Sequence, residues 1–187
     1  RIVDGSINFD GIDLRAASEP EKRKLWGARI AYVAQSAAAS FNPAHRLIDQ
    51  TVETAVRDGL MTRDKAVADA VDLYGRLQLP NPQTIGDRYP HQVSGGQLQR
   101  AMTAMAMSCR PDLIIFDEPT TALDVTTQAE ILDLIARLGA ERGMAVMFIT
   151  HDMGVVAEIA DRVIVMHHGK IRETGPAETI FHAPADD

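Results

Sequence analysis

The chain is organised around the stretch Tyr89-Pro90-His91-Gln92-Val93-Ser94-Gly95-Gly96-Gln97-Leu98-Gln99-Arg100, followed by Asp112-Leu113-Ile114-Ile115-Phe116-Asp117-Glu118-Pro119. In the first part, Ser94 is a good N-cap residue, and Gln97 stands three positions later, which is the spacing of a capping box. Gly95 and Gly96 leave the first-turn N–H groups open to an approaching phosphate, and the helix dipole is positive there. The stretch therefore predicts a helix whose start can bind an anion.

The second part predicts a strand that ends in two carboxylates. The run Leu113 to Phe116 is continuously apolar, which is typical of a strand buried on both faces of a parallel sheet. Asp117 and Glu118 follow at its carboxyl end, the edge where open α/β sheets bind ligands. Pro119 blocks continuation of the strand.

Two further short apolar runs predict strands with polar residues at their ends. Residues 29–34 lead to Gln35, and residues 145–149 lead to Thr150 and His151. We expect the single tryptophan, Trp26, to pack in the core. Strands that alternate with helical segments in this way predict an α/β fold.

Between the first two of these strands, the composition is helical over residues 46–79, and Pro80-Asn81-Pro82 ends that run. Residues 36–43 read as a loop of small residues. Hairpins are predicted at Asp10-Gly11 and at His168-Gly169. The sequence thus predicts a compact helical subdomain inserted into an α/β core.

Composition narrows the class of protein. The 187 residues are 45% hydrophobic and 24% charged, with a net charge of −7 and one cysteine, Cys109. The acidic balance and the lack of a Lys/Arg run argue against binding to a nucleic-acid backbone. No apolar run reaches the roughly 18–20 residues that span a bilayer. These features predict a cytoplasmic protein.

Five motifs resemble those of ATP-binding-cassette (ABC) ATPases, and they occur along the chain in the order found in that family. Ser94-Gly95-Gly96-Gln97 resembles the signature, Leu113 to Glu118 the Walker B strand, and Ala122-Leu123-Asp124 the loop after it. The other two are the glutamine loop, Tyr32-Val33-Ala34-Gln35, and the histidine switch, Phe148-Ile149-Thr150-His151-Asp152. The resemblance covers nearly the whole chain and implies a partial P-loop, RecA-like nucleotide-binding core. On it, residues 36–104 are the helical subdomain with the signature, and residues 1–35 and 105–187 are pieces of the core.

One motif of these ATPases is missing, the phosphate loop Gly-x4-Gly-Lys-Ser/Thr. The one Gly-Lys pair is Gly169-Lys170, and Ile164 occupies the position of the required earlier glycine. Since the family places this loop before the glutamine loop, we expect the chain to be an N-terminally cut piece of an ABC ATPase subunit. We expect this piece to be inactive by itself.

The resemblance also assigns roles, with ATP and Mg²⁺ as cofactors. Asp117 and Gln35 would hold Mg²⁺, Glu118 would act as general base, and His151 would bridge the terminal phosphate and the attacking water. The nucleotide would also contact Gln35. The signature residues Ser94, Gly95, Gly96 and Gln97 would bind the nucleotide of a second ATPase subunit. Asp124 would lie at the interface between the two subunits. Alone, Asp117 and Glu118 would read as two solvated acids at a strand end.

Two other kinds of site are weaker interpretations. A hydrolase triad built on Ser94 and His151 fails because Gln92 occupies the first glycine of Gly-x-Ser-x-Gly. His167-His168 has no third metal ligand at a credible spacing, so an exposed turn is the better interpretation.

The finer resemblance is to ATPase subunits of dipeptide, oligopeptide and nickel importers, carried by residues 117–126, 150–162 and 40–43. It implies transmembrane permease partners, a second ATPase subunit, an indirect link to a solute-binding protein, and a place on the inner face of the cell membrane. Ala38 and Phe41 are the expected contacts to the permease. The alternative is a soluble ABC ATPase of DNA repair or translation, and a third possibility is a binding or folding module without activity.

Overall fold

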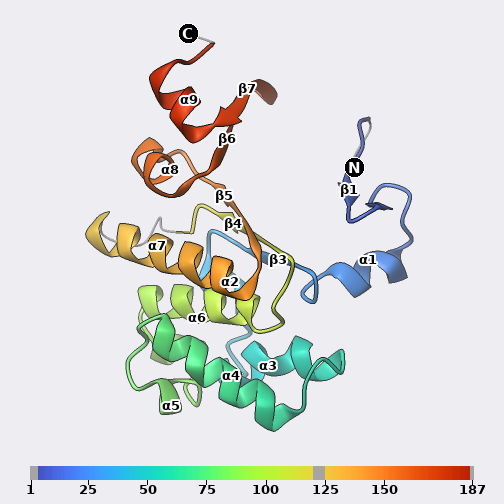
Figure 1. Cartoon of the computed structure of the whole chain (residues 1–187). Coiled ribbons are helices and arrows are strands. Elements are labelled where there is room, and N and C mark those ends of the chain that lie inside the picture. The colour runs from blue at the N-terminus through green and yellow to red at the C-terminus, as the bar shows by residue number, and fades with distance from the viewer. Residues whose placement is uncertain (1–3, 120–124, 186–187) are drawn as a thin grey trace.

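The computed structural model describes residues 4–119 and 125–185, and of residues 125–131 it describes the backbone only. Its centre is a parallel sheet in the order β3-β4-β5 (Figure 1). The strands are β3 (Ile30–Val33), β4 (Leu113–Asp117) and β5 (Ala145–Ile149). In register, Val33 lies opposite Phe116, and Phe116 lies opposite Phe148. The predicted parallel α/β core is confirmed.

Within residues 4–119 and 125–185, helices cover one face of the sheet. Side chains on that face, such as Val33, Ile114 and Phe116, are fully buried against α6 (Gly95–Met107) and α7 (Val125–Arg142). On the opposite face, Tyr32 is 58% and Ile149 48% exposed. In β4, for which burial on both faces was predicted, Leu113 and Ile115 on this face are half-buried, so the prediction holds only in part for the described residues. The continuous apolar run leaves hydrophobic side chains on an open face of the sheet.

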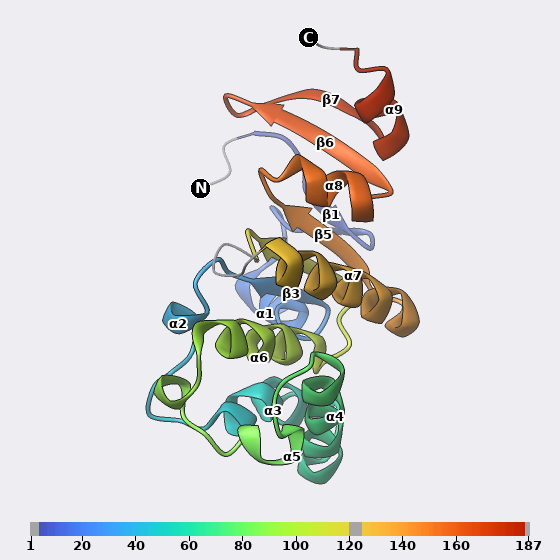
Figure 2. The same ribbon diagram turned by 90° about the vertical axis from the view of Figure 1, so that its left-hand side faces the viewer.

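The inserted helices lie at the end of the molecule away from the C-terminal hairpin (Figure 2). They are α3 (Leu47–Arg57), α4 (Arg63–Arg76), the short α5 (Pro82–Ile85) and the 3₁₀ turn η1 (Pro90–Gln92). Helix α6 contacts both α3 and α4 on one side and β3 on the other. It therefore joins the helical part to the sheet. The helices agree with the predicted subdomain, whose boundaries at residues 36 and 104 stay a prediction.

The loop predicted at residues 36–43 contains one helical turn, α2 (Ala37–Ser40). The Ser36 side chain accepts a hydrogen bond from the Ala39 N–H and caps this turn. Phe41 is only 4% exposed and belongs to the core, whereas Ala38 is exposed. Phe41 is thus not available on the surface as the expected permease contact.

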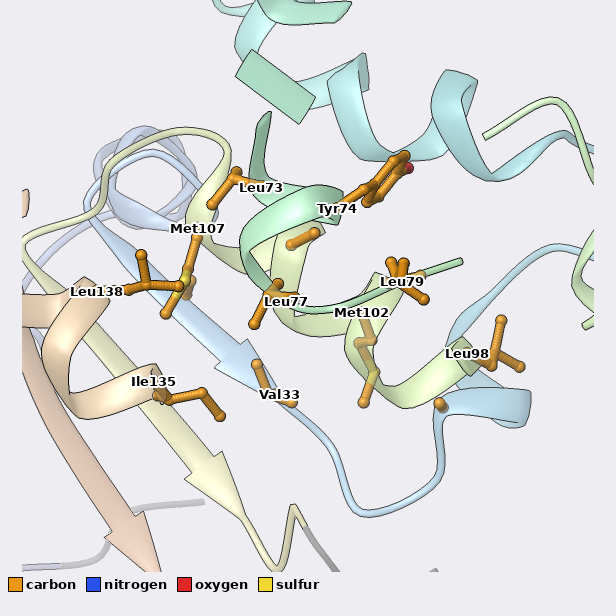
Figure 3. Packing of buried hydrophobic residues seen from close by; sticks show 14 of the residues in the cluster. Val33, Leu73, Tyr74, Leu77, Leu79, Leu98, Met102, Met107, Ile135 and Leu138 are labelled. Carbon is orange, nitrogen blue, oxygen red and sulfur yellow. The ribbon is translucent and has the colours of Figure 1, made fainter. Parts of the chain in front are cut away.

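The hydrophobic core is continuous between the sheet and the inserted helices (Figure 3). Val33 of β3, Met102 of α6 and Leu77 after α4 converge there, together with Ile135 and Leu138 of α7. The methionines of α6 thus fill core space, as expected from their flexible side chains.

Smaller elements flank the core. The predicted hairpins are present as β1 (Asn8–Phe9) with β2 (Ile12–Asp13), and as β6 (Arg162–His167) with β7 (Lys170–Pro176). Three short helices complete the described chain: α1 (Glu19–Leu25), α8 (Met153–Ile159) and α9 (Ala177–His182). None of the helices in residues 4–119 and 125–185 has the length and apolar character needed to cross a membrane.

Core packing of Trp26 was a wrong prediction, since this side chain is 50% exposed. Trp26 is the residue at which α1 ends, and its backbone is extended. Gly27 follows with φ +78°, a turn that favours glycine. The tryptophan therefore stands at a chain reversal between α1 and β3, where its ring is left half in solvent.

An ion-pair cluster, defined by Asp69, Asp72, Arg110 and Arg142, ties α4 to the end of α7. The Asp69 carboxylate accepts from Arg142 at 3.2 Å and from Arg110 at 3.1 Å, and Arg142 lies 3.8 Å from Asp72. The side chains of Arg142 and Asp69 are only 11% and 15% exposed. An ion pair that is this well shielded from solvent is costly to break on one side only, because the remaining charge stays buried.

We predict that Asp69→Ala lowers the free energy of unfolding of the 187-residue chain by about 2 kcal/mol, because Arg142 loses its main partner while buried. Urea denaturation measures this change. The matched control is Asp133→Ala, which breaks the exposed ion pair between Asp133 and Arg137. Both variants replace an aspartate in a helix by alanine, so both gain the same helix propensity. That variant should shift stability by no more than about 0.5 kcal/mol. Equal stabilities for the two variants would contradict the role of the cluster.

Candidate functional site

The tip of β4 presents two carboxylates in a constrained backbone. Asp117 is the last residue of the strand, and Glu118 follows with φ +45°, in the left-handed region. The Glu118 N–H donates to the carbonyl of Ile149 at 2.9 Å, so the turn is fixed against β5. Non-glycine residues adopt such a φ at a cost, and they do so mostly where the surrounding structure holds them.

Glu118 gathers polar side chains from the two neighbouring strands. Gln35, which follows β3, donates from Nε2 to Oε2 of Glu118 at 2.8 Å. His151, which follows β5, places Nδ1 2.9 Å from Oε1 of Glu118. Three residues predicted from separate motifs thus meet around one carboxylate.

This arrangement suits a general base. The Glu118 carboxylate is partly shielded, with 31% of its side chain exposed, while the His151 side chain is 82% exposed and faces solvent. A carboxylate held by two neighbours keeps a fixed orientation from which it can accept a proton from a water molecule. The imidazole beside it can donate or accept at the same place.

Asp117 has a partner that the motifs did not predict. The Tyr32 hydroxyl donates to Oδ2 of Asp117 at 2.6 Å, and this bond is the main cause that raises the pKa of Tyr32. Tyr32 was part of the predicted glutamine loop but received no role. Tyr32 and Asp117 lie on the same face of two adjacent parallel strands, which follows only from the register between β3 and β4.

The oxygen donors of this edge fit a magnesium ion. Asp117 supplies a carboxylate, and Gln35 retains a carbonyl oxygen because its Nε2 is the atom bonded to Glu118. Within the described ranges, no group of three or more His, Cys, Asp or Glu side chains is placed to hold a metal by itself. Mg²⁺ does not need such a group of side chains, because it is commonly held by one or two protein oxygens, with waters and substrate phosphates completing its coordination shell.

The predicted anion-binding helix start has the expected capping box. The Gln97 N–H donates to Ser94 Oγ at 3.3 Å, and the Ser94 N–H donates to Gln97 Oε1 at 3.1 Å. A side chain added at Gly95 would meet no atom within 4 Å, so the approach to the first turn is open. Ser94 and Gln97 bond to each other and form a cluster of their own at the start of α6.

Three further predictions concern Asp124, the Gly-Lys pair at residues 169–170 and the two adjacent histidines. Asp124 lies outside the described residues. Gly169 lies in the turn between β6 and β7 with φ +73°, and Lys170 begins β7, so this pair is not a phosphate loop. The rings of His167 and His168 lie 4.0 Å apart at that turn, as expected for a hairpin end.

Residues 2–121 match the protein family described as ABC transporter. The chain is 50% identical over 175 residues to the glutathione import ATP-binding protein GsiA of Shigella dysenteriae. It is also 50% identical over 177 residues to the protein of the same name from Salmonella choleraesuis. These matches cover 94% and 95% of the chain, but the chain spans only 28% of the length of each relative.

Solved structures of this kind share the fold. A dimeric post-hydrolysis structure of the ATP-binding cassette MJ0796 bound to ADP and Pi matches with a TM-score of 0.80 at 26% identity, over 94% of this chain and 74% of that one. cbiO1 from Clostridium perfringens, part of the ABC transporter complex cbiONQ, matches with a TM-score of 0.80 at 26% identity, over 97% and 69%.

We predict that Ser94→Ala lowers the free energy of unfolding by about 1 kcal/mol, because the Gln97 N–H loses its acceptor at the start of α6. Ser94→Asp is the control, since aspartate caps helices equally well and should leave stability near the original value. Chemical denaturation of both variants measures this difference. Equal losses in both would contradict a capping role.

Proposed function

The chain belongs to the ABC transporter family, and on that premise we propose that it is part of an ATP-binding and ATP-hydrolysing subunit that powers an importer. The observation that carries the proposal is the meeting of Gln35, Glu118 and His151 at the end of three parallel strands, beside Asp117. It is the arrangement that a positioned carboxylate needs in order to activate water next to a metal-bound phosphate.

In this proposal, each side chain has one task. Asp117 and Gln35 would hold Mg²⁺, which would supply positive charge against the phosphates. Glu118 accepts the proton of the attacking water, and His151 orients that water and the terminal phosphate. The phosphate loop comes from a part of the protein outside these 187 residues, so the chain by itself does not hydrolyse ATP.

A second subunit completes the site. We assign Ser94, Gly95, Gly96 and Gln97 to the nucleotide of the opposite subunit, because their N–H groups form an open anion-binding helix start. Asp124 is assigned to the interface between the two subunits. The dimeric form of the MJ0796 cassette supports this arrangement. Residues 36–104 then act as the helical subdomain, and residues 1–35 and 105–187 as parts of the nucleotide-binding core.

The subunit would work on the cytoplasmic face of the membrane, bound to transmembrane permease subunits and linked through them to a solute-binding protein. The relatives of highest identity reported above are named for glutathione import. Because glutathione is a tripeptide, we propose peptides or related small solutes as the cargo.

We predict that Glu118→Gln in the full-length protein leaves ATP binding intact and slows hydrolysis by about 10²–10⁴-fold, because the amide keeps the shape but loses the basicity. ATP-locked dimers should accumulate. Steady-state ATPase rates and size-exclusion chromatography with ATP measure the two effects. Hydrolysis by the variant near the wild-type rate would show that Glu118 is not the base.

The 187-residue chain is the negative control for that experiment. It should show no steady ATP hydrolysis, because the Gly-x4-Gly-Lys-Ser/Thr sequence is absent from it. Turnover by this chain that Glu118→Gln abolishes would contradict the assignment of the phosphate loop to another part of the protein.

We also predict that Ala38→Glu in the full-length subunit abolishes either assembly with the permease or solute transport, while the basal ATPase activity is kept. Ala38 is exposed on α2, just after Gln35, so a charge there would disturb a helix-in-groove contact without affecting the core. Co-purification with the permease and solute uptake measure the effect. Leu60→Glu, at an exposed site after α3, is the control that should assemble normally. Normal transport by Ala38→Glu would remove α2 from the coupling surface, and strong salt-dependent DNA binding without a permease would favour the nucleic-acid alternative.

A further inference from the structure

Tyr32 is the residue at this edge whose contact the proposed reaction has not used. In the parallel register of β3 and β4, Tyr32 lies opposite Ile115. Asp117 stands two positions further along β4, and therefore on the same face of the sheet. A tyrosine is long enough to reach such a diagonal neighbour, and its hydroxyl lies 2.6 Å from Oδ2 of Asp117.

The contact has the length of a strong hydrogen bond. Bonds from O–H to a carboxylate measure about 2.5–2.7 Å and are stronger than those between neutral groups. The bond also restrains the last side-chain torsion of Asp117, which is otherwise broad for a carboxylate. The phenol can act only as a donor toward an ionised carboxylate, so it directs one oxygen of Asp117 and leaves the other to accept from a different partner.

Within the described residues, the Tyr32 ring is not part of the buried core. Its side chain stands on the open face of the sheet, and the residue is 58% exposed. Its neighbours along β3 on the opposite face, Ala31 and Val33, are buried in the core. The hydroxyl is the part of this side chain that makes the specific contact, to Oδ2 of Asp117.

We propose that Tyr32 is a positioning residue that orients the Asp117 carboxylate toward the Mg²⁺ of the bound nucleotide. The inference rests on the proposed function, since it deepens the role of Asp117 in that same site. Residues that orient a metal-binding side chain typically contribute about 10–100-fold to metal affinity or activity. Because water can partly replace the hydroxyl at an exposed site, we expect about the lower end of that range.

The experiment measures how much Mg²⁺ tightens ATP binding in the full-length protein with Glu118→Gln, which prevents turnover. A fluorescent ATP analogue is titrated in EDTA and again in excess Mg²⁺, and the ratio of the two dissociation constants is the readout. Adding Tyr32→Phe should reduce this ratio by about tenfold and leave the affinity in EDTA unchanged. The unchanged EDTA value also shows that the variant is folded.

Two further variants isolate the hydroxyl-to-carboxylate contact. Tyr74→Phe removes a buried tyrosine hydroxyl that bonds to Thr51, far from any predicted ligand, and should leave the ratio unchanged. In an Asp117→Asn background, Tyr32→Phe should have little additional effect, because the two side chains act as one unit.

The possible results separate the two hypotheses. If the protein shows Mg²⁺-dependent ATP binding but Tyr32→Phe leaves the ratio unchanged, the positioning role is wrong and the proposed function stands. An effect of Tyr32→Phe that persists in full with Asp117→Asn would also overturn it, since the hydroxyl would then act elsewhere. If the protein shows no Mg²⁺-dependent ATP binding, whether it carries Tyr32 or the Tyr32→Phe substitution, the proposed function itself fails.

Discussion

Parallel pairing of β4 with both β3 and β5 is the interaction on which the site depends. Parallel strands end at the same edge of a sheet, so Gln35, Glu118 and His151 are brought together from positions that are far apart in the sequence. A shift in register by one residue would turn every side chain of β4 to the opposite face. It would separate Asp117 from Tyr32 and expose Phe116, which is fully buried. The cost of exposing the core side of the strand therefore also protects the geometry of its polar end.

Helix α6 connects the sheet to the inserted helices. Its first residues form the capped, open helix start, and its length packs on β3 and against α3 and α4. Because a rigid helix moves as one body, a contact at Ser94 that displaces α6 would also displace the helices packed along it. The Asp69 ion-pair cluster holds α4 to the end of α7 and limits such motion at that position. Under the proposed function, these two connections are the contacts through which coupling between nucleotide and membrane partner would pass.

Sequence patterns predicted the strands and the major helices, because these lie in segments with strong periodicity. The roles of Gln35 and His151 at one site with Glu118 came from the resemblance to ABC ATPases. They failed where the outcome depends on what packs against a residue. Trp26 and Phe41 are both large and apolar, and nothing in their local sequence shows that one is exposed and the other buried. Tyr32 was missed for another reason, since its role appears only once the register beside β4 is known. Local pattern specifies elements, whereas burial and diagonal contacts are properties of their assembly.

The backbone of Glu118 shows how this edge is maintained against a local preference. A non-glycine residue at φ +45° costs about 1–3 kcal/mol, and a glycine would be free of most of that cost. The conformation persists because its N–H is bonded to Ile149 and its side chain to Gln35 and His151. These bonds form only when all three strands are paired, so the strained turn depends on the assembled sheet. Backbone strain alone would favour glycine at this position. That a glutamate stands there, with its carboxylate at the centre of the polar cluster, is best explained by a requirement for the carboxylate itself.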